Sequence, residues 1–264
     1  MPRIGTMKNL LEIWQYRELL YFFVWKDIKV KYKQTSVGII WAIMQPLLGC
    51  GLFTIIFGKF ANVPSDGLPY PLFYFAALIS WTYFSTSLTM SANSIIGNTQ
   101  LITKIYFPRV MLPASSVCAM LLDLSITLVL LMFLILFYGT PISINLVLLF
   151  FVMCILIWFT FSIGLLFSAL VVRFRDIRYA IPFAIQVWLF ASPIVYPLSI
   201  IPEKYKWLYF FNPLTGIIES SRSLISGGQI VWESLNWSIG ITAVTFIIGF
   251  QYFRRTERWF ADII

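Results

Sequence analysis

Histidine is absent from the sequence, and charged residues are scarce. None of the 264 residues is histidine, and Asp, Glu, Lys and Arg make up 11%, against about 25% in a soluble domain. The lack of histidine excludes His-dependent catalysis and His-ligated metals. The three cysteines lie in apolar runs without a CxxC spacing, which argues against a disulfide framework or a zinc site. Hydrophobic residues make up 59% of the chain, so the composition indicates a polytopic membrane protein.

The uncharged runs predict an all-α membrane domain with six spans, because a span needs roughly 20 apolar residues. The uncharged run 124–172 is too long for one helix and breaks at Gly139-Thr140-Pro141, a turn signal. The chain is expected to form a single domain, residues 1–264, with a cytoplasmic interface segment 1–35, a six-span region 36–253 and a cytoplasmic tail 254–264. The predicted spans are residues 37–57, 70–90, 111–138, 146–172, 179–197 and 237–253.

Lysine and arginine gather on one side of these spans. Six spans place both termini on one side, and a cytoplasmic placement puts 15 of the 19 Lys and Arg residues there, as the positive-inside rule expects. This placement explains most of the +8 net charge without nucleic acid. Residues 173–178 then form a tight cytoplasmic turn with at least a topogenic role. Asp123 is the one charge deep within a predicted span; it either faces protein or water, or lies shallower and reaches the interface.

The chain lacks an energy source of its own. It has no GxxxxGK[ST] motif to hold ATP phosphates, and no cluster of membrane acids that would indicate proton coupling. A transporter, a channel and a membrane enzyme all fit the observations so far.

Several motifs follow one another in an order that resembles a known family. Residues 17–48 carry an aromatic and basic segment, KYKQT, and a span with Gly38, Trp41 and Pro46 in the pattern G-x-x-W-x-x-x-x-P. The chain resembles the membrane subunits of ABC-2 type transporters that export polysaccharide or polyol phosphate, over nearly its whole length. The further matching motifs are LITKIYFPRVMLP (101–113), VRFRDIRY (172–179), SPIVYP (192–197), FNPLTGIIESSRSLISG (211–227) and ERWFADII (257–264).

The resemblance implies a permease subunit without enzymatic activity. It would form a homodimer with two copies of a separate ATPase subunit, which would bind ATP and Mg²⁺, and this chain would bind no cofactor itself. The complex would sit in the bacterial inner membrane and move a lipid-linked polysaccharide, such as O-antigen, teichoic acid or capsule, outward from the cytoplasm. An ABC-2 permease for a small lipophilic drug is the second interpretation, and an intramembrane enzyme of lipid or glycan synthesis is the alternative from another class.

Two segments on the cytoplasmic side are predicted to be amphipathic. Residues 8–26 can lie in the interface plane, as a topogenic anchor or, as the resemblance implies, near the ATPase. Residues 93–107 are too polar to cross the membrane but keep an apolar face, so they are either an ordinary connector or a helix that docks in a partner's groove. The resemblance makes the second segment the coupling helix. The residues expected near its ATPase contact are Asn98, Leu101, Lys104, Phe107 and Arg109.

Prolines interrupt the chain before the last span. Pro193 and Pro197 oppose a continuous helix, so residues 192–228 are expected to form a re-entrant pair of half-helices that acts as an outer gate; a plain outer loop is the alternative. Glu219 and Arg222, three residues apart, can pair within this gate.

The sugar path is expected to be lined by aromatic side chains. Trp41, Trp188 and Tyr196 can offer apolar ring faces to the C–H surfaces of a sugar. Placement in the aromatic belts at the membrane interfaces is the alternative for each of them.

The charge asymmetry predicts which segments face the cytoplasm. In a variant without the three native cysteines, single cysteines at Ser36 and Pro141 should differ in labelling by an impermeant thiol reagent in intact cells. Only the cysteine at position 141 is expected to react. Labelling near Arg175 from outside would contradict the predicted orientation.

Overall fold

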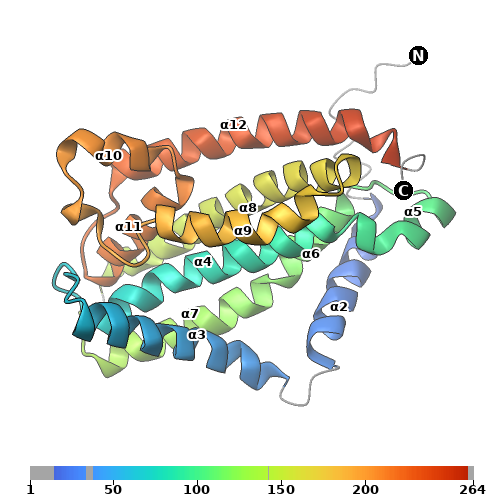
Figure 1. The fold of residues 1–264 in the computed structure, drawn as a ribbon. Coiled ribbons are helices and arrows are strands. Elements are labelled where there is room, and N and C mark those ends of the chain that lie inside the picture. Colours follow the sequence, from blue (N-terminus) through green and yellow to red (C-terminus); the bar gives the residue numbers. More distant parts are fainter. Residues whose placement is uncertain (1–14, 34–37, 142, 261–264) are drawn as a thin grey trace.

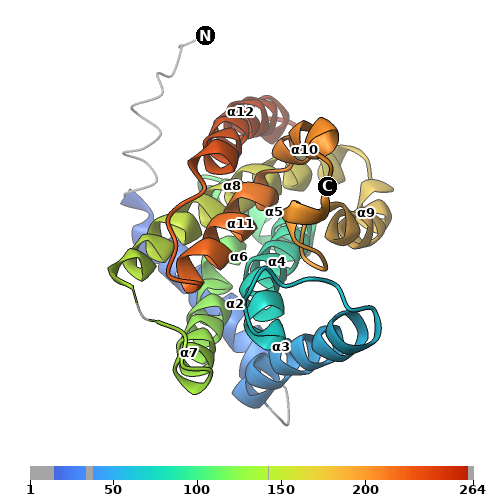
Figure 2. The same cartoon turned by 90° about the vertical axis from the view of Figure 1, so that its left-hand side faces the viewer.

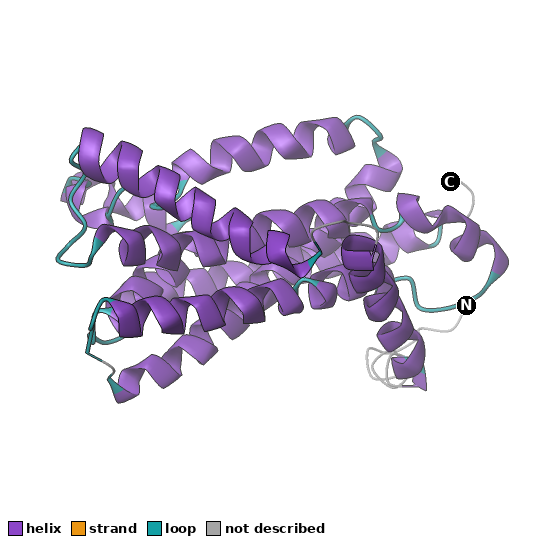
Figure 3. Cartoon of the chain, turned by 90° about the horizontal axis from the view of Figure 1, so that it is seen from below, coloured by secondary structure: helices purple, strands orange, loops and turns teal. Residues whose placement is uncertain are grey.

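The computed structural model describes residues 15–33, 38–141 and 143–260. Those residues form helices joined by short loops, and no strand occurs among them (Figures 1 and 3). The prediction of an all-α fold is therefore confirmed for the described residues. Residues 8–14 of the predicted interface segment and residues 261–264 of the tail lie outside them.

The helices are α2 (Arg17–Lys33), α3 (Ile39–Phe53), the π-helix η1 (Thr54–Phe60), α4 (Tyr70–Asn93), the 3₁₀-helix η2 (Ile96–Asn98), α5 (Thr99–Lys104), α6 (Met111–Ala119), α7 (Leu121–Phe137), the 3₁₀-helix η3 (Ile144–Val147), α8 (Leu148–Arg173), α9 (Ile177–Ala191), the 3₁₀-helix η4 (Leu198–Ile200), α10 (Glu203–Phe210), α11 (Pro213–Ile225) and α12 (Trp232–Glu257).

Four helical segments of the described chain are long and apolar enough to cross a membrane. They are Ile40–Phe60, Met111–Phe137, Ile144–Arg173 and Trp232–Glu257, and they match the predicted spans 1, 3, 4 and 6. The third predicted span divides at Met120 into α6 and α7. The turn signal at residues 139–141 falls, as expected, between α7 and α8.

The other two predicted spans, α4 and α9, do not meet the same criterion. α4 has 24 residues, but its serine, threonine and tyrosine side chains lower its mean hydropathy. α9 has only 15 residues, because the helix ends at Ala191 before the first proline of the Pro193/Pro197 pair. The helix therefore ends six residues before the predicted end of the span at residue 197, directly before the predicted gate segment 192–228.

α4 is the central helix of the bundle. It packs against α3, α6, α7, α8, α9 and α11, and the view along the bundle places it between these helices (Figure 2). Its aromatic side chains Phe73, Tyr74, Phe75 and Phe84 are fully buried in the main hydrophobic core. The remaining surface of α4 carries hydroxyl groups, which the functional site uses.

A second hydrophobic cluster holds one end of the bundle together. This end, here named the basic end, contains α2, α5, the turn between α8 and α9, and the C-terminal end of α12 (Figure 1). Phe23 of α2 packs against Phe107 with ring centroids 5.4 Å apart, and Phe253 packs against Phe260 at 5.4 Å. The opposite end, named the far end, contains α10 and the loop 61–69.

The predicted amphipathic helix 93–107 is not one continuous helix. α4 extends to Asn93, the short η2 follows, and α5 ends at Lys104, where Ile105 turns to an extended conformation. Ile95, Ile102 and Phe107 are buried against the rest of the protein. The apolar side of this segment therefore faces inward, because the basic-end core needs those side chains.

Small residues allow three helices of the bundle to approach closely. A Cβ on Gly216 of α11 would lie 2.4 Å from the carbonyl oxygen of Ser234 on α12, and one on Gly249 of α12 would lie 2.7 Å from that of Ser162 on α8. Such contacts are typical of helix packing in membranes, where small residues bring backbones together.

We predict that Gly216→Ala destabilises the protein by about 1–3 kcal/mol, because α11 and α12 must move apart to admit the new methyl group. Gly240→Ala on α12 is the matched control, since its Cβ would meet no atom within 4 Å. Thermal unfolding in detergent should show a lower midpoint for Gly216→Ala alone. Equal midpoints for both variants would contradict the close approach.

Candidate functional site

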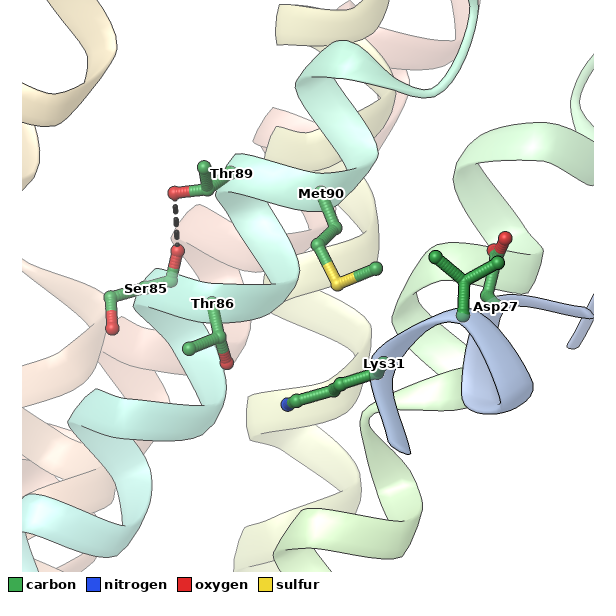
Figure 4. Close-up of a pocket in the computed structure, with 7 residues that line it drawn as sticks. Asp27, Lys31, Ser85, Thr86, Thr89 and Met90 are labelled. Atoms are coloured by element: carbon green, nitrogen blue, oxygen red, sulfur yellow. Dashed lines mark hydrogen bonds between the residues drawn. The ribbon is translucent and has the colours of Figure 1, made fainter. Parts of the chain in front are cut away.

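A groove lined by both polar and apolar side chains lies between α2 and α4 near the basic end. Asp27 and Lys31, one turn apart on α2, face Ser85, Thr86 and Thr89 of α4 across a cavity of about 500 Å³. The Lys31 side chain extends from α2 toward α4 (Figure 4). The hydroxyls recur at intervals of three and four residues, so they share one face of α4.

A second cavity of about 90 Å³ continues the groove toward α3 and α7. Lys31 and Thr86 line both cavities. The second cavity adds Trp41 and Gln45 of α3 and Asp123 of α7. The two cavities together, here named the inner groove, place polar groups from four helices around one space.

The charges around the inner groove are paired with one another. Both the Lys31 ammonium and the Tyr32 hydroxyl donate to the Asp123 carboxylate. Asp123 is only 18% exposed, so of the two interpretations of this residue the structure supports contact with protein.

Asp27 has neighbours of its own. The Ser115 hydroxyl donates to its carboxylate at 3.3 Å, and the Lys26 ammonium lies 3.5 Å away. Burial raises the pKa of the Asp27 carboxyl, while Lys26 acts in the opposite direction.

Two glutamines expose amide groups in the middle of apolar helices. Gln45 lies within α3 and Gln186 within α9, and both side chains are exposed. An amide in contact with hydrocarbon alone would lose its hydrogen bonds, which costs several kcal/mol. Both positions therefore need water or another protein surface beside them.

Arg222 organises the far end. Its guanidinium is buried and donates to the carbonyl oxygens of Pro193 at 2.7 Å and Ile194 at 2.8 Å. It also donates to the Phe73 carbonyl at 3.2 Å and lies 3.6 Å from the centre of the Phe73 ring. The predicted pairing with Glu219 is present, with an N–O distance of 3.3 Å. The guanidinium thus satisfies backbone carbonyls that the proline break leaves without helical partners.

The structure does not bring the three aromatic residues predicted for the path together. Trp41 is 57% exposed and lines the inner groove. Trp188 is only partly exposed: its ring packs on Phe84 and its indole N–H donates to Asn212 at 3.1 Å. The Tyr196 hydroxyl forms a 3.0 Å hydrogen bond with the hydroxyl of Tyr209 near the far end.

Four of the five residues predicted to contact an ATPase also contact other parts of the protein. Asn98 accepts a 2.7 Å hydrogen bond from Lys26, Leu101 is partly buried and Phe107 is buried in the basic-end core. The guanidinium of Arg109 donates to the Glu257 carbonyl oxygen. Lys104 alone of the five is fully accessible.

The sequence analysis did not predict several of the residues near α5 and around the inner groove. Ile105 and Tyr106, next to Lys104, are 58% and 83% exposed. The hydroxyls of α4 and the two glutamines were also missed, although polar residues inside predicted spans are a readable signal.

The described residues thus form a bundle of apolar helices with a groove beside its central helix. The chain belongs to the ABC-2 type transporter family, whose profile matches residues 18–225. An O-antigen export system permease protein of Klebsiella pneumoniae is 32% identical over 248 residues, which cover 94% of this chain and 95% of that protein. A protein of the same name from Myxococcus xanthus is 30% identical over 217 residues, 81% of this chain and 82% of the relative. A polysialic acid transport protein of Escherichia coli is 28% identical over 239 residues, 88% and 91% of the two chains.

Membership of this family establishes the general role of the chain. It is a multi-pass membrane component of a transporter and not an enzyme, as the sequence predicted. The alternative of an intramembrane enzyme of lipid or glycan synthesis is thereby excluded.

We predict that Arg222→Met destabilises the protein by about 3–5 kcal/mol, because it leaves Glu219 as a buried charge without its partner. Lys206→Met is the matched control: Lys206 also pairs with a glutamate three residues away, but that glutamate, Glu203, is 88% exposed. Thermal unfolding should separate the two variants clearly. A small effect of both would show that the far end does not depend on the buried guanidinium.

Proposed function

We propose that this chain is the membrane-spanning permease subunit of an ATP-driven exporter that moves a lipid-linked polysaccharide from the cytoplasm outward. The observation that carries the proposal is the inner groove, where the hydroxyls of α4 and the Gln45 amide lie beside apolar side chains and the charges are paired internally. The names of the relatives, which refer to O-antigen and polysialic acid, support the same class of substrate.

The groove chemistry suits a sugar chain. Hydroxyl groups on α4 exchange single, weak hydrogen bonds with sugar hydroxyls, each worth about 0.5–1.5 kcal/mol net. The exposed ring of Trp41 can cover the C–H face of a sugar unit. A small lipophilic drug, the second interpretation, could pack against Val30 and Met90 but would make no use of the hydroxyls and the Gln45 amide.

Six spans remain the proposed topology, with α4 and α9 as the second and fifth. At 1.5 Å per residue the 15 residues of α9 extend about 22 Å, less than the roughly 30 Å of the hydrocarbon core. The segment 192–197 would complete the crossing, since Arg222 supplies hydrogen bonds to its carbonyls. α10 and α11 would be the re-entrant pair, and Pro193, Pro197, Glu219 and Arg222 would shape the outer gate.

The proposed assembly is a homodimer with two ATPase subunits, which bind ATP and Mg²⁺, in the bacterial inner membrane. The exposed glutamines of α3 and α9 favour a second copy of the chain, because a facing copy encloses a shared aqueous path around them. The basic end would face the cytoplasm with both termini. Lys104, Ile105 and Tyr106 are the most accessible part of α5 and its following turn, so we place the ATPase contact there.

The proposed function is tested by reconstituting the chain with its ATPase subunit in proteoliposomes and measuring ATP-dependent movement of a lipid-linked glycan. Thr86→Val removes a hydroxyl that lines both cavities, and we expect transport to fall roughly two- to tenfold, the equivalent of one hydrogen bond. Thr242→Val is the control, because this buried hydroxyl on α12 lies outside both groove linings. ATP-dependent movement of a lipophilic dye but of no glycan would instead support the drug permease.

A further inference from the structure

α2 touches both the docking segment and the inner groove. The docking segment is defined here as residues 94–106, which include η2 and α5. Near the middle of α2 the Lys26 ammonium donates to the Asn98 carboxamide at 2.7 Å, while the Asn98 amide donates to the Ser94 carbonyl at 2.8 Å. Asn98 is therefore bound both to α2 and to the end of the segment that continues α4.

The following turns of α2 carry the polar side chains of the groove. Asp27 lies next to Lys26 and contacts Ser115 of α6, and Lys31 with Tyr32 contacts Asp123 of α7. Residues 26–32 span about 9 Å of helix at 1.5 Å per residue. One short, stiff piece of α2 thus joins the docking segment, α6, α7 and the lining of the inner groove.

The packing around α2 makes this connection specific. Phe23 rests on Phe107 and is 3% exposed, so an apolar contact ties the helix to the region after α5. The Lys26–Asn98 hydrogen bond is a polar contact that fixes α2 against η2. Lys29, on the same helix, instead lies over the exposed ring of Trp25 and does not contact the docking segment.

We propose that Lys26 and Asn98 are positioning residues for coupled transport: their hydrogen bond lets α2 carry a displacement of the docking segment to the inner groove. The proposal rests on the proposed function, because it needs an ATPase bound at the docking segment. It assigns Asn98 an internal role instead of a direct contact with the ATPase. Lys31 and Asp27 move with α2, so the groove changes shape when the docking segment moves.

The test uses the complete complex with its ATPase subunit in proteoliposomes. Asn98→Ala and Lys26→Ala should lower glycan transport about five- to tenfold, within the range of coupling between distant sites, while the ATPase still co-purifies and hydrolyses ATP at nearly the normal rate. The double variant should be no worse than Lys26→Ala, because both substitutions remove the same bond and Lys26→Ala also removes the cation beside Asp27. Asn98→Asp keeps an acceptor for Lys26 and should recover most of the transport. Lys29→Ala, of the same charge change on α2, should match the unmodified protein.

A second readout does not depend on the glycan. A cysteine at Thr89, in a variant without native cysteines, should react with a thiol reagent at different rates with and without ATP. Asn98→Ala should remove that difference, and Asn98→Asp should keep it. If the unmodified complex moves no glycan but shows the ATP-dependent labelling, the proposed function fails while this inference stands.

Three results would overturn the inference. Loss of ATPase co-purification in Asn98→Ala would make Asn98 a contact residue, as the sequence predicted. Additive losses in the double variant would show that the two side chains act separately. Unchanged transport and labelling in both single variants would show that the bond carries no displacement.

Discussion

The buried guanidinium of Arg222 is the interaction on which the far end depends. A chain that interrupts a helix at membrane depth must find hydrogen-bond donors for the carbonyls it frees, because lipid supplies none. Proline has no backbone N–H to donate, so the carbonyls near Pro193 need donors from elsewhere in the protein. Arg222 meets it from a different helix, with a planar group that reaches several oxygens at once. Glu219 compensates the charge, and the ring of Phe73 covers the guanidinium face. α9, α11 and the start of α4 are thereby fixed to one another through a single side chain.

A related constraint shapes the centre of the bundle. α4 is buried among six other helices, yet it carries many hydroxyl side chains. Several of these donate to carbonyls of their own helix, as Thr86 and Thr89 do, which satisfies them without a partner helix. α4 can therefore be central and polar at once. The same hydroxyl side chains lower the mean hydropathy of α4 below that expected of a membrane span, although the helix lies inside the bundle.

The predictions succeeded where local chemistry decides the structure. The Glu219–Arg222 pair follows from a spacing of three residues on a helix, and the break between α7 and α8 follows from a glycine and a proline. They were incomplete where contacts distant in the sequence decide it. Asn98 and Arg109 contact Lys26 and Glu257, and no local pattern around residue 98 or 109 contains those partners. Trp188 is held by Asn212 for the same reason. The hydroxyl face of α4 could have been predicted from the sequence, because its polar residues interrupt an otherwise apolar run.

The charged side chains around the inner groove also hold α2 against its neighbours. A groove lined with free lysines would hold an anionic chain strongly at each position, and one lined with free carboxylates would hold cations. Here Lys31 is engaged by Asp123, and Asp27 by Lys26 and Ser115, so the charged groups serve the fold first. The rest of the groove lining consists of the hydroxyls of α4, the Gln45 amide, the exposed indole ring of Trp41 and apolar side chains such as Val30 and Met90. The Lys31–Asp123 ion pair fastens α2 to α7, and the Ser115–Asp27 hydrogen bond fastens it to α6. The contacts that compensate the charges of the groove are thus also contacts that hold α2 in its place.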